Sequence, residues 1–311
     1  MNWQSIRRKS IAPFAVACTT ICMIGVPAAH ATTTAALPDW VCAHPDAIFV
    51  DGFQPADAIT RLPSNGSGGA TGNVSRTVNV PGYPPGTFTI YLHVPASYSP
   101  SHPVPIVLAL HGYAGAGNAP AAAQSVRTLW TPVSDANGFI LVVPIATGAS
   151  GDWKLPPPNP SDYSIFAAAI ADAESAYNID RSRRIGWGFS AGGHVMHDIM
   201  FNDFGAPVSI DMFAAYSVSA GALQELACFG DNAAECNARV GAASRHIPID
   251  IHVGTTDPLL PYATSDKNIF INNGWVLSQN LWFTTFTGGH TFATTQLSEA
   301  WSHLCPFQAL P

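Results

Sequence analysis

The chain has 311 residues, of which 47% are hydrophobic and only 11% are charged, with a formal net charge of −7 at pH 7. The chain has only 13 Lys and Arg residues, which argues against binding of nucleic acid or of a polyanionic substrate. A neutral or weakly charged ligand is therefore expected. The length allows one large α/β domain with an ample core.

Residues 1–31 have the pattern of a secretory signal peptide. Arg7, Arg8 and Lys9 precede an apolar stretch, which ends in the small residues Ala29-His30-Ala31. Prolines and threonines interrupt the stretch, which disfavours a membrane anchor. We therefore expect a mature chain that starts at Thr32, is secreted to the extracellular space or the periplasm, and has no membrane association once the signal is removed.

Four cysteines remain after removal of the signal: Cys42, Cys228, Cys236 and Cys305. An even number in an exported chain predicts two disulfides, for which three pairings are possible. The short loop between Cys228 and Cys236 favours a local bridge, which would leave Cys42 to pair with Cys305.

Residues 32–75 are expected to form an N-terminal segment and a linker. The run Ser64–Asn73 is so rich in Gly, Ser and Asn that it predicts a flexible connection. The catalytic domain is then expected to span residues 76–311.

After this segment, the strand pattern begins with Arg76–Val80 and Thr87–Pro95, which predict an antiparallel pair. Near-continuous apolar runs follow, as is typical of strands buried on both faces of a parallel sheet. These runs are Val104–Leu110, Phe139–Ile145, Arg184–Trp187, Phe213–Val218, Ile247–Val253 and Leu281–Phe286. Helical stretches alternate with them at Ala119–Trp130, Asp162–Tyr177, Gly193–Phe201 and Thr294–Leu304. The alternation predicts a mostly parallel, doubly wound sheet with flanking helices.

The pentapeptide Gly188-Phe189-Ser190-Ala191-Gly192 directly follows one of the predicted strands. A serine raised above a sheet edge on a strand-to-helix turn needs glycine two positions to either side, because strand and helix approach closely there. Ser190 is therefore the predicted nucleophile of an α/β-hydrolase fold.

A serine hydroxyl needs a histidine to take its proton and a carboxylate to orient that histidine. Asp257 and His290 each follow a predicted strand and come in the chain order serine, acid, histidine that this fold uses. Alone, Asp257-Pro258 could be a turn and His290 a surface residue; their joint placement favours catalysis. The competing acids are Asp250 and Asp266, and the competing bases are His252, His194, His197 and His303. We interpret His252 as a strand residue that braces the acid loop.

Acyl transfer also needs donors for a developing oxyanion. The backbone N–H groups of Ala191 and Tyr113 are the predicted donors, the second from the loop after the strand Val104–Leu110. His111 is then interpreted as a support of that loop. No Cys/His cluster has zinc spacing, so neither a metal nor any other cofactor is predicted.

The residues around these positions resemble secreted esterases of the polyhydroxybutyrate depolymerase and feruloyl esterase type, carbohydrate esterase family 1. The resemblance covers about Arg76 to Leu304 and rests on four segments: Leu110–Gly112, Gly188–Gly193, His252–Tyr262 and Gly288–Thr291. It implies an α/β-hydrolase that cleaves esters. Depolymerases of this type often carry a cysteine after His-Gly and a tryptophan soon after the catalytic histidine, where this chain has Tyr113 and Phe292.

The primary functional hypothesis is hydrolysis of carboxylic esters through an acyl-enzyme, with polyhydroxybutyrate-type polyesters as substrates and the protein as a monomer. The alternative is a feruloyl or acetylxylan esterase acting on plant cell-wall esters. A serine peptidase and a noncatalytic binding protein on the same fold are the less favoured hypotheses. Trp153, Tyr262, Trp275 and Trp282 are candidates for stacking on a hydroxycinnamoyl ring, with burial in the core as the simpler interpretation.

Overall fold

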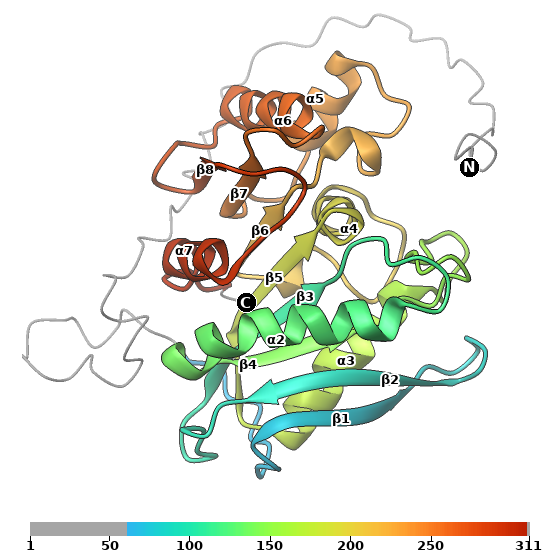
Figure 1. Cartoon of the computed structure of the whole chain (residues 1–311), viewed down its shortest axis with the longest axis vertical. Coiled ribbons are helices and arrows are strands. Elements are labelled where there is room, and N and C mark those ends of the chain that lie inside the picture. The colour runs from blue at the N-terminus through green and yellow to red at the C-terminus, as the bar shows by residue number, and fades with distance from the viewer. Residues whose placement is uncertain (1–60, 310–311) are drawn as a thin grey trace, which may run out of the picture. The chain divides into compact units, whose positions relative to one another are not determined.

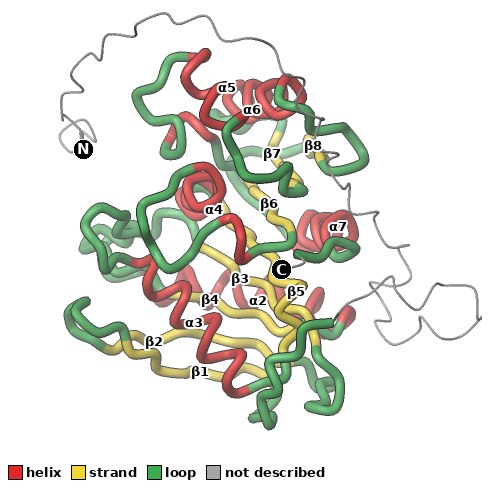
Figure 2. The backbone as a smooth tube through the Cα atoms, turned by 180° about the vertical axis from the view of Figure 1, so that it is seen from behind, coloured by secondary structure: helices red, strands yellow, loops and turns green. Residues whose placement is uncertain are grey.

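The computed structural model describes residues 61–309, which form an eight-stranded sheet with helices on both faces (Figures 1 and 2). The strand order is β1-β2-β4-β3-β5-β6-β7-β8; β1 and β2 are antiparallel to their neighbours, and the remaining pairs are parallel. This arrangement confirms the predicted antiparallel opening pair and the mostly parallel sheet. Within residues 61–309, no helix is long and apolar enough to cross a membrane.

The strands have the following bounds: β1 Gly72–Asn79, β2 Thr87–Val94, β3 Val104–Leu110, β4 Ile140–Pro144, β5 Ile179–Phe189, β6 Ala215–Ser219, β7 Ile249–Gly254 and β8 Leu281–Phe286. The α-helices are α2 Ala119–Asn137, α3 Asp162–Ala176, α4 Ala191–Phe201, α5 Ala233–Gly241, α6 Leu260–Asn272 and α7 Thr294–Leu304. Two short 3-10 helices are η3 Ile210–Met212 and η4 Leu223–Glu225.

The central strands bury both of their faces, as their apolar runs predict. In β3, Ile106 and Leu108 belong to the core under α3 and α4, whereas Val107 and Ala109 belong to the core under α2 and α7. Successive side chains of a strand point to opposite faces, so an unbroken apolar run supplies both cores at once. Helices α2 and α7 therefore cover one face and α3 to α6 the other (Figures 1 and 2).

The expected flexible linker is corrected by the structure, because this segment is fixed against the end of α3 and the start of β5. The Ser64 N–H donates to Ile179 O at 2.8 Å, and the Gly68 N–H donates to Ala176 O at 2.9 Å. A Cβ at Gly66 would lie 2.4 Å from Tyr177 O. Gly66 and Gly69 thus serve close packing against Tyr177 rather than flexibility. The last residues of the segment begin β1.

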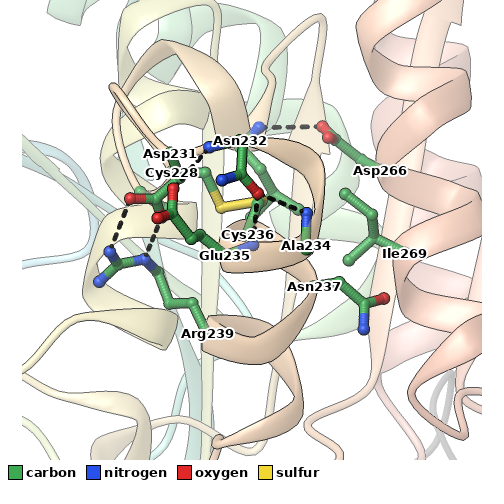
Figure 3. The surroundings of a disulfide bond; sticks show 12 residues. Cys228, Asp231, Asn232, Ala234, Glu235, Cys236, Asn237, Arg239, Asp266 and Ile269 are labelled. Carbon is green, nitrogen blue, oxygen red and sulfur yellow. Dashed lines mark hydrogen bonds and ion pairs between the residues drawn. A yellow bond between two sulfur atoms is a disulfide. The ribbon is translucent and has the colours of Figure 1, made fainter.

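The predicted local disulfide is present: Cys228 and Cys236 are bonded, with their Cα atoms 5.2 Å apart. The bridge joins the loop after η4 to α5, beside the Arg239–Asp231 ion pair (Figure 3). The Asn232 side chain caps α5 by accepting from the N–H groups of Ala234 and Glu235. The predicted signal peptide, Cys42 and hence the Cys42–Cys305 pairing lie outside the described residues.

Candidate active site

Ser190 sits at the sharp turn between β5 and α4, as predicted. Its backbone has φ +52° and ψ −119°, a strained conformation for a residue with a side chain. The turn is fixed because the Ser190 N–H donates to Ser219 O of β6 at 2.9 Å. A Cβ at Gly188 would lie 2.1 Å from Gly192 O, and one at Gly192 would lie 2.4 Å from Leu110 O. Both positions therefore require glycine.

The loop after β3 lies against this turn. A Cβ at Gly112 would be 3.2 Å from the Ser190 Cβ, so the backbone just before Tyr113 is in contact with the serine. The next residue, Ala114, donates its N–H to Gly151 O at 3.1 Å, which fixes the loop from the other side. Ala191 is the first residue of α4, where backbone N–H groups have no acceptor within the helix. Tyr113 and Ala191 thus flank Ser190, and their role as oxyanion donors remains a prediction.

His111 supports the loop in a defined tautomer. Its Nε2 lies 3.1 Å from the Ala146 N–H and must accept that bond, so Nδ1 carries the proton that it donates to Gly112 O at 2.6 Å. Burial lowers the pKa of His111 to about 4, which keeps the ring neutral. The Trp153 indole donates to His111 O at 2.9 Å. These contacts agree with the interpretation of His111 as a loop support.

The structure brings Ser190, His290 and Asp257 together. The His290 Nε2 lies 2.8 Å from the Ser190 Oγ, and its Nδ1 lies 3.0 Å from Asp257 Oδ2 and 3.2 Å from Oδ1. Asp257 is buried, whereas 38% of the His290 side chain is exposed. A neutral His290 that donates from Nδ1 to the carboxylate presents a free lone pair at Nε2 to the serine proton.

The loops that carry Asp257 and His290 are tied to each other. The N–H of Thr255 donates to Phe286 O at 2.8 Å, and the N–H of Thr256 donates to Gly288 O at 2.9 Å. A Cβ at Gly254 would lie 2.3 Å from Gly289 O, so the two loops pack backbone to backbone. Asp257 Oδ1 also accepts the Leu259 N–H at 2.8 Å, which fixes the carboxylate plane.

Aromatic packing around His290 was not predicted from the sequence. The Phe189 ring centroid lies 5.0 Å from that of His290 and 4.7 Å from that of Phe292, and Phe292 also contacts Trp187 at 4.9 Å. In the sequence, the only sign of this packing is that Phe189 lies inside the serine pentapeptide and that Phe292 lies two residues after His290. The rings restrict where the imidazole can move.

The competing carboxylates are used elsewhere. Asp250 is fully buried and pairs with His252 at 2.8 Å. Asp266 is buried in α6 and accepts the Leu223 N–H at 2.9 Å, and burial raises its pKa to about 7. His290 pairs with Asp257 rather than with either of these carboxylates.

The competing histidines are likewise engaged elsewhere. His194 accepts the Ala222 N–H at 2.9 Å, and burial lowers its pKa to about 4. His197 is fully buried against Tyr216, and burial lowers its pKa to about 3. His252 and His303 contact Asp250. As neutral rings, the partly buried His194 and the fully buried His197 have structural roles.

The candidate stacking aromatics are mostly core residues. Trp153 and Trp275 are buried, and Trp282 stacks on His303 with 4.9 Å between ring centroids. Tyr262 is 41% exposed and Tyr113 is 58% exposed. Tyr262 therefore remains the one exposed residue among the predicted stacking candidates, and Tyr113, which follows Gly112 in the loop against Ser190, is a second exposed tyrosine. Among residues 61–309, no group of three or more His, Cys, Asp or Glu residues is placed to hold a metal ion.

The chain is similar to known proteins both in sequence and in structure. No family model matches the chain. A bifunctional acetylxylan esterase/xylanase of Neocallimastix patriciarum is 28% identical over 175 residues, which are 56% of this chain and 22% of that protein. The chain therefore spans about a fifth of the length of this curated relative.

Solved structures with a similar fold include a ferulic acid esterase, with a TM-score of 0.56 and 17% identity over 75% of this chain and 97% of the other. A feruloyl esterase module from Clostridium thermocellum, complexed with sinapinate, has a TM-score of 0.55 and 18% identity over 82% and 96%. An S-formylglutathione hydrolase from Staphylococcus aureus has a TM-score of 0.51 and 13% identity over 76% and 98%. The sheet order, the serine turn and these similarities together show that the chain has the α/β-hydrolase fold.

Proposed function

We propose that this protein is a serine hydrolase of carboxylic esters, with Ser190 as nucleophile, His290 as general base and then acid, and Asp257 as the residue that orients His290. The observation that carries the proposal is the continuous chain of short contacts from Ser190 Oγ through His290 to Asp257. Its support comes from the strained turn that presents the serine and from the esterases that share the fold.

In the proposed reaction, Ser190 Oγ attacks the ester carbonyl carbon while His290 Nε2 takes the hydroxyl proton. The carbonyl π electrons move onto oxygen and form an oxyanion. The backbone N–H groups of Tyr113 and Ala191 would donate hydrogen bonds to this oxyanion, and each donor would stabilise the transition state by about 3 kcal/mol. The tetrahedral intermediate collapses, the ester C–O bond breaks, and His290 protonates the leaving alkoxide. Water, deprotonated by His290, then attacks the acyl carbon and forms a second tetrahedral intermediate. The bond from that carbon to Ser190 Oγ breaks, His290 returns the proton to Oγ, and the acid is released.

Within the esters, we propose plant cell-wall substrates, namely feruloyl or acetyl esters of polysaccharides. The sequence alone put polyhydroxybutyrate-type polyesters first; the curated relative is instead named for acetylxylan, and two similar structures are named for ferulic or feruloyl esters. Tyr113 follows the Gly112 backbone that contacts Ser190 and is 58% exposed, so its ring is a candidate aromatic surface for a hydroxycinnamoyl group. The cell-wall hypothesis is therefore the better supported of the two.

We further propose that the protein is exported and acts as a monomer. The leader pattern of residues 1–31 supports export, as does the Cys228–Cys236 disulfide, a bond that persists in oxidising compartments.

The test is the initial hydrolysis rate of the purified chain from Thr32 on methyl ferulate, acetylated xylan, p-nitrophenyl butyrate and a polyhydroxybutyrate suspension. Ser190→Ala is the control for contaminating esterases. We expect turnover of the first two substrates that Ser190→Ala abolishes. Clearing of the polyester without turnover of methyl ferulate or acetylxylan would overturn the substrate class, and wild-type inactivity on all four would overturn the esterase proposal.

A further inference from the structure

A cluster of titratable side chains lies outside the candidate active site, in the core between the sheet and α7. Asp250 and His252 are two residues apart on β7, so both point to the same face of the sheet, and each is fully buried. His252 Nε2 lies 2.8 Å from Asp250 Oδ2. From α7, His303 Nδ1 lies 3.4 Å from the same Asp250 oxygen.

A contribution to the stability of the fold does not by itself explain this buried cluster. Burying a carboxylate and an imidazolium removes both from water, and such pairs are often no better for stability than apolar side chains of similar volume. Burial raises the pKa of Asp250, but the attraction of His252 and His303 outweighs it and lowers the pKa overall. Burial lowers the pKa of His252, and Asp250 more than reverses this effect. Each of the two groups therefore shifts the pKa of the other toward its charged form.

The neighbouring elements complete the contact between α7 and the sheet. Glu299 of α7 accepts from the Thr284 hydroxyl of β8 at 3.1 Å, and its charge also attracts His252. Trp282 of β8 stacks on His303, with its ring plane only 10° from that of the imidazole. On β6, Ser217 and Ser219 pair in register with Asp250 and His252 and carry no charge. Helix α7 thus has a hydrogen bond to β8, through Glu299 and Thr284, and an ion-pair-distance contact to β7, through His303 and Asp250.

The two strands that hold α7 also carry the acid and the base. Asp257 follows β7 by three residues, and His290 lies on the connection between β8 and α7, four residues before the helix begins. Any rotation or sliding of α7 against β7 would therefore pull the short connection that carries His290. A displacement of about 1 Å at a reacting group can reduce a rate by as much as a hundredfold.

We propose that Asp250, His252 and His303 form a positioning cluster that sets α7 against β7 and thereby holds His290 at hydrogen-bonding distance from Ser190 and Asp257. This proposal rests on the proposed esterase function. The three residues touch no reacting atom in it; they act through the helix that follows His290.

The test uses His303→Ala, because His303 is partly exposed and its removal leaves the buried Asp250–His252 pair intact. We expect kcat for p-nitrophenyl acetate to fall about tenfold while KM changes by less than about twofold, because the active-site groups remain and only their alignment is lost. His303→Asn places an amide donor near the former Nδ1 position and should recover most of the lost kcat. Val126→Ala in α2 is the control, since it removes buried apolar volume on the same face of the sheet without touching the cluster.

Thermal unfolding of each variant and the rate of Ser190 labelling by a fluorophosphonate accompany the kinetics. The labelling rate should fall in His303→Ala in proportion to kcat, whereas Val126→Ala should lose stability but keep its kcat. An unchanged kcat in His303→Ala, an equal kcat loss in Val126→Ala, or no recovery in His303→Asn would overturn the positioning role and leave the esterase proposal standing. No labelling and no turnover in the wild-type protein would overturn both.

Discussion

Replacing Asp257 by Asn tests the assignment of the acid with almost no change in shape. In the wild-type protein, Asp257 Oδ1 accepts the Leu259 N–H at 2.8 Å, and Oδ2 lies 3.0 Å from His290 Nδ1. The Leu259 donor would keep the amide oxygen of Asn at the Oδ1 position, so the amide NH₂ would take the Oδ2 position. An NH₂ group there donates, and it favours the His290 tautomer that accepts at Nδ1 and carries its proton on Nε2.

In that tautomer His290 cannot accept the Ser190 proton. The expected loss in kcat is about 10⁴-fold, the effect of the same substitution in a Ser-His-Asp protease, which corresponds to about 5.4 kcal/mol of transition-state stabilisation. The assay is steady-state hydrolysis of p-nitrophenyl butyrate at pH 7.5, with thermal unfolding to confirm folding. Asp266→Asn is the matched control, because it makes the same exchange at a buried carboxylate that accepts the Leu223 N–H. Retention of more than about a tenth of kcat in Asp257→Asn, or a larger loss in Asp266→Asn, would refute the choice of acid.

Two further predictions concern stability. Because burial raises the folded-state pKa of Asp266 to about 7, the folded protein binds an extra proton there between the unfolded value near 3.9 and pH 7. The contribution of Asp266 to the free energy of unfolding is therefore fully present below about pH 4 and is lost as the pH rises to 7. At pH 8, Asp266→Asn should unfold at a higher temperature than the wild type, and this difference should shrink toward pH 4. A difference that grows on acidification would contradict this sign. Second, the Cys228→Ser/Cys236→Ser double variant removes a crosslink across a sequence separation of 8. Chain entropy predicts a loss of about 2.5 kcal/mol in urea unfolding, with ester turnover below the transition retained, and a loss under about 0.5 kcal/mol would exclude this role for the bridge.

Most of the fold could be predicted from the apolar runs of the sequence and from the spacing of its glycines. The predicted strand at Leu281–Phe286 and the predicted helix at Thr294–Leu304 agree with β8 and α7 at both ends. Ser190, Asp257 and His290 were identifiable because each follows a predicted strand, and parallel strands bring their carboxyl ends to one edge of the sheet.

Other features depend on tertiary contacts that one sequence does not reveal. Helix α6 has apolar residues without a clear stripe, and its first turn overlaps the acid segment, so it was not predicted. The glycines of residues 64–73 suggested flexibility, but Gly66 and Gly69 let the backbone lie against Tyr177. Trp153 was a candidate for substrate stacking and instead packs on His111 at 4.5 Å between ring centroids. For the glycines and for Trp153, the residue that they contact lies far away in the chain.

The central claim is that Ser190 forms a covalent acyl intermediate. The most direct measurement mixes the protein with p-nitrophenyl butyrate, quenches with acid within milliseconds, and determines the intact mass and the modified peptide by mass spectrometry. We expect one butyryl group on the peptide that contains Ser190 and none in Ser190→Ala. A butyryl group on another residue, or full turnover by Ser190→Ala, would contradict it.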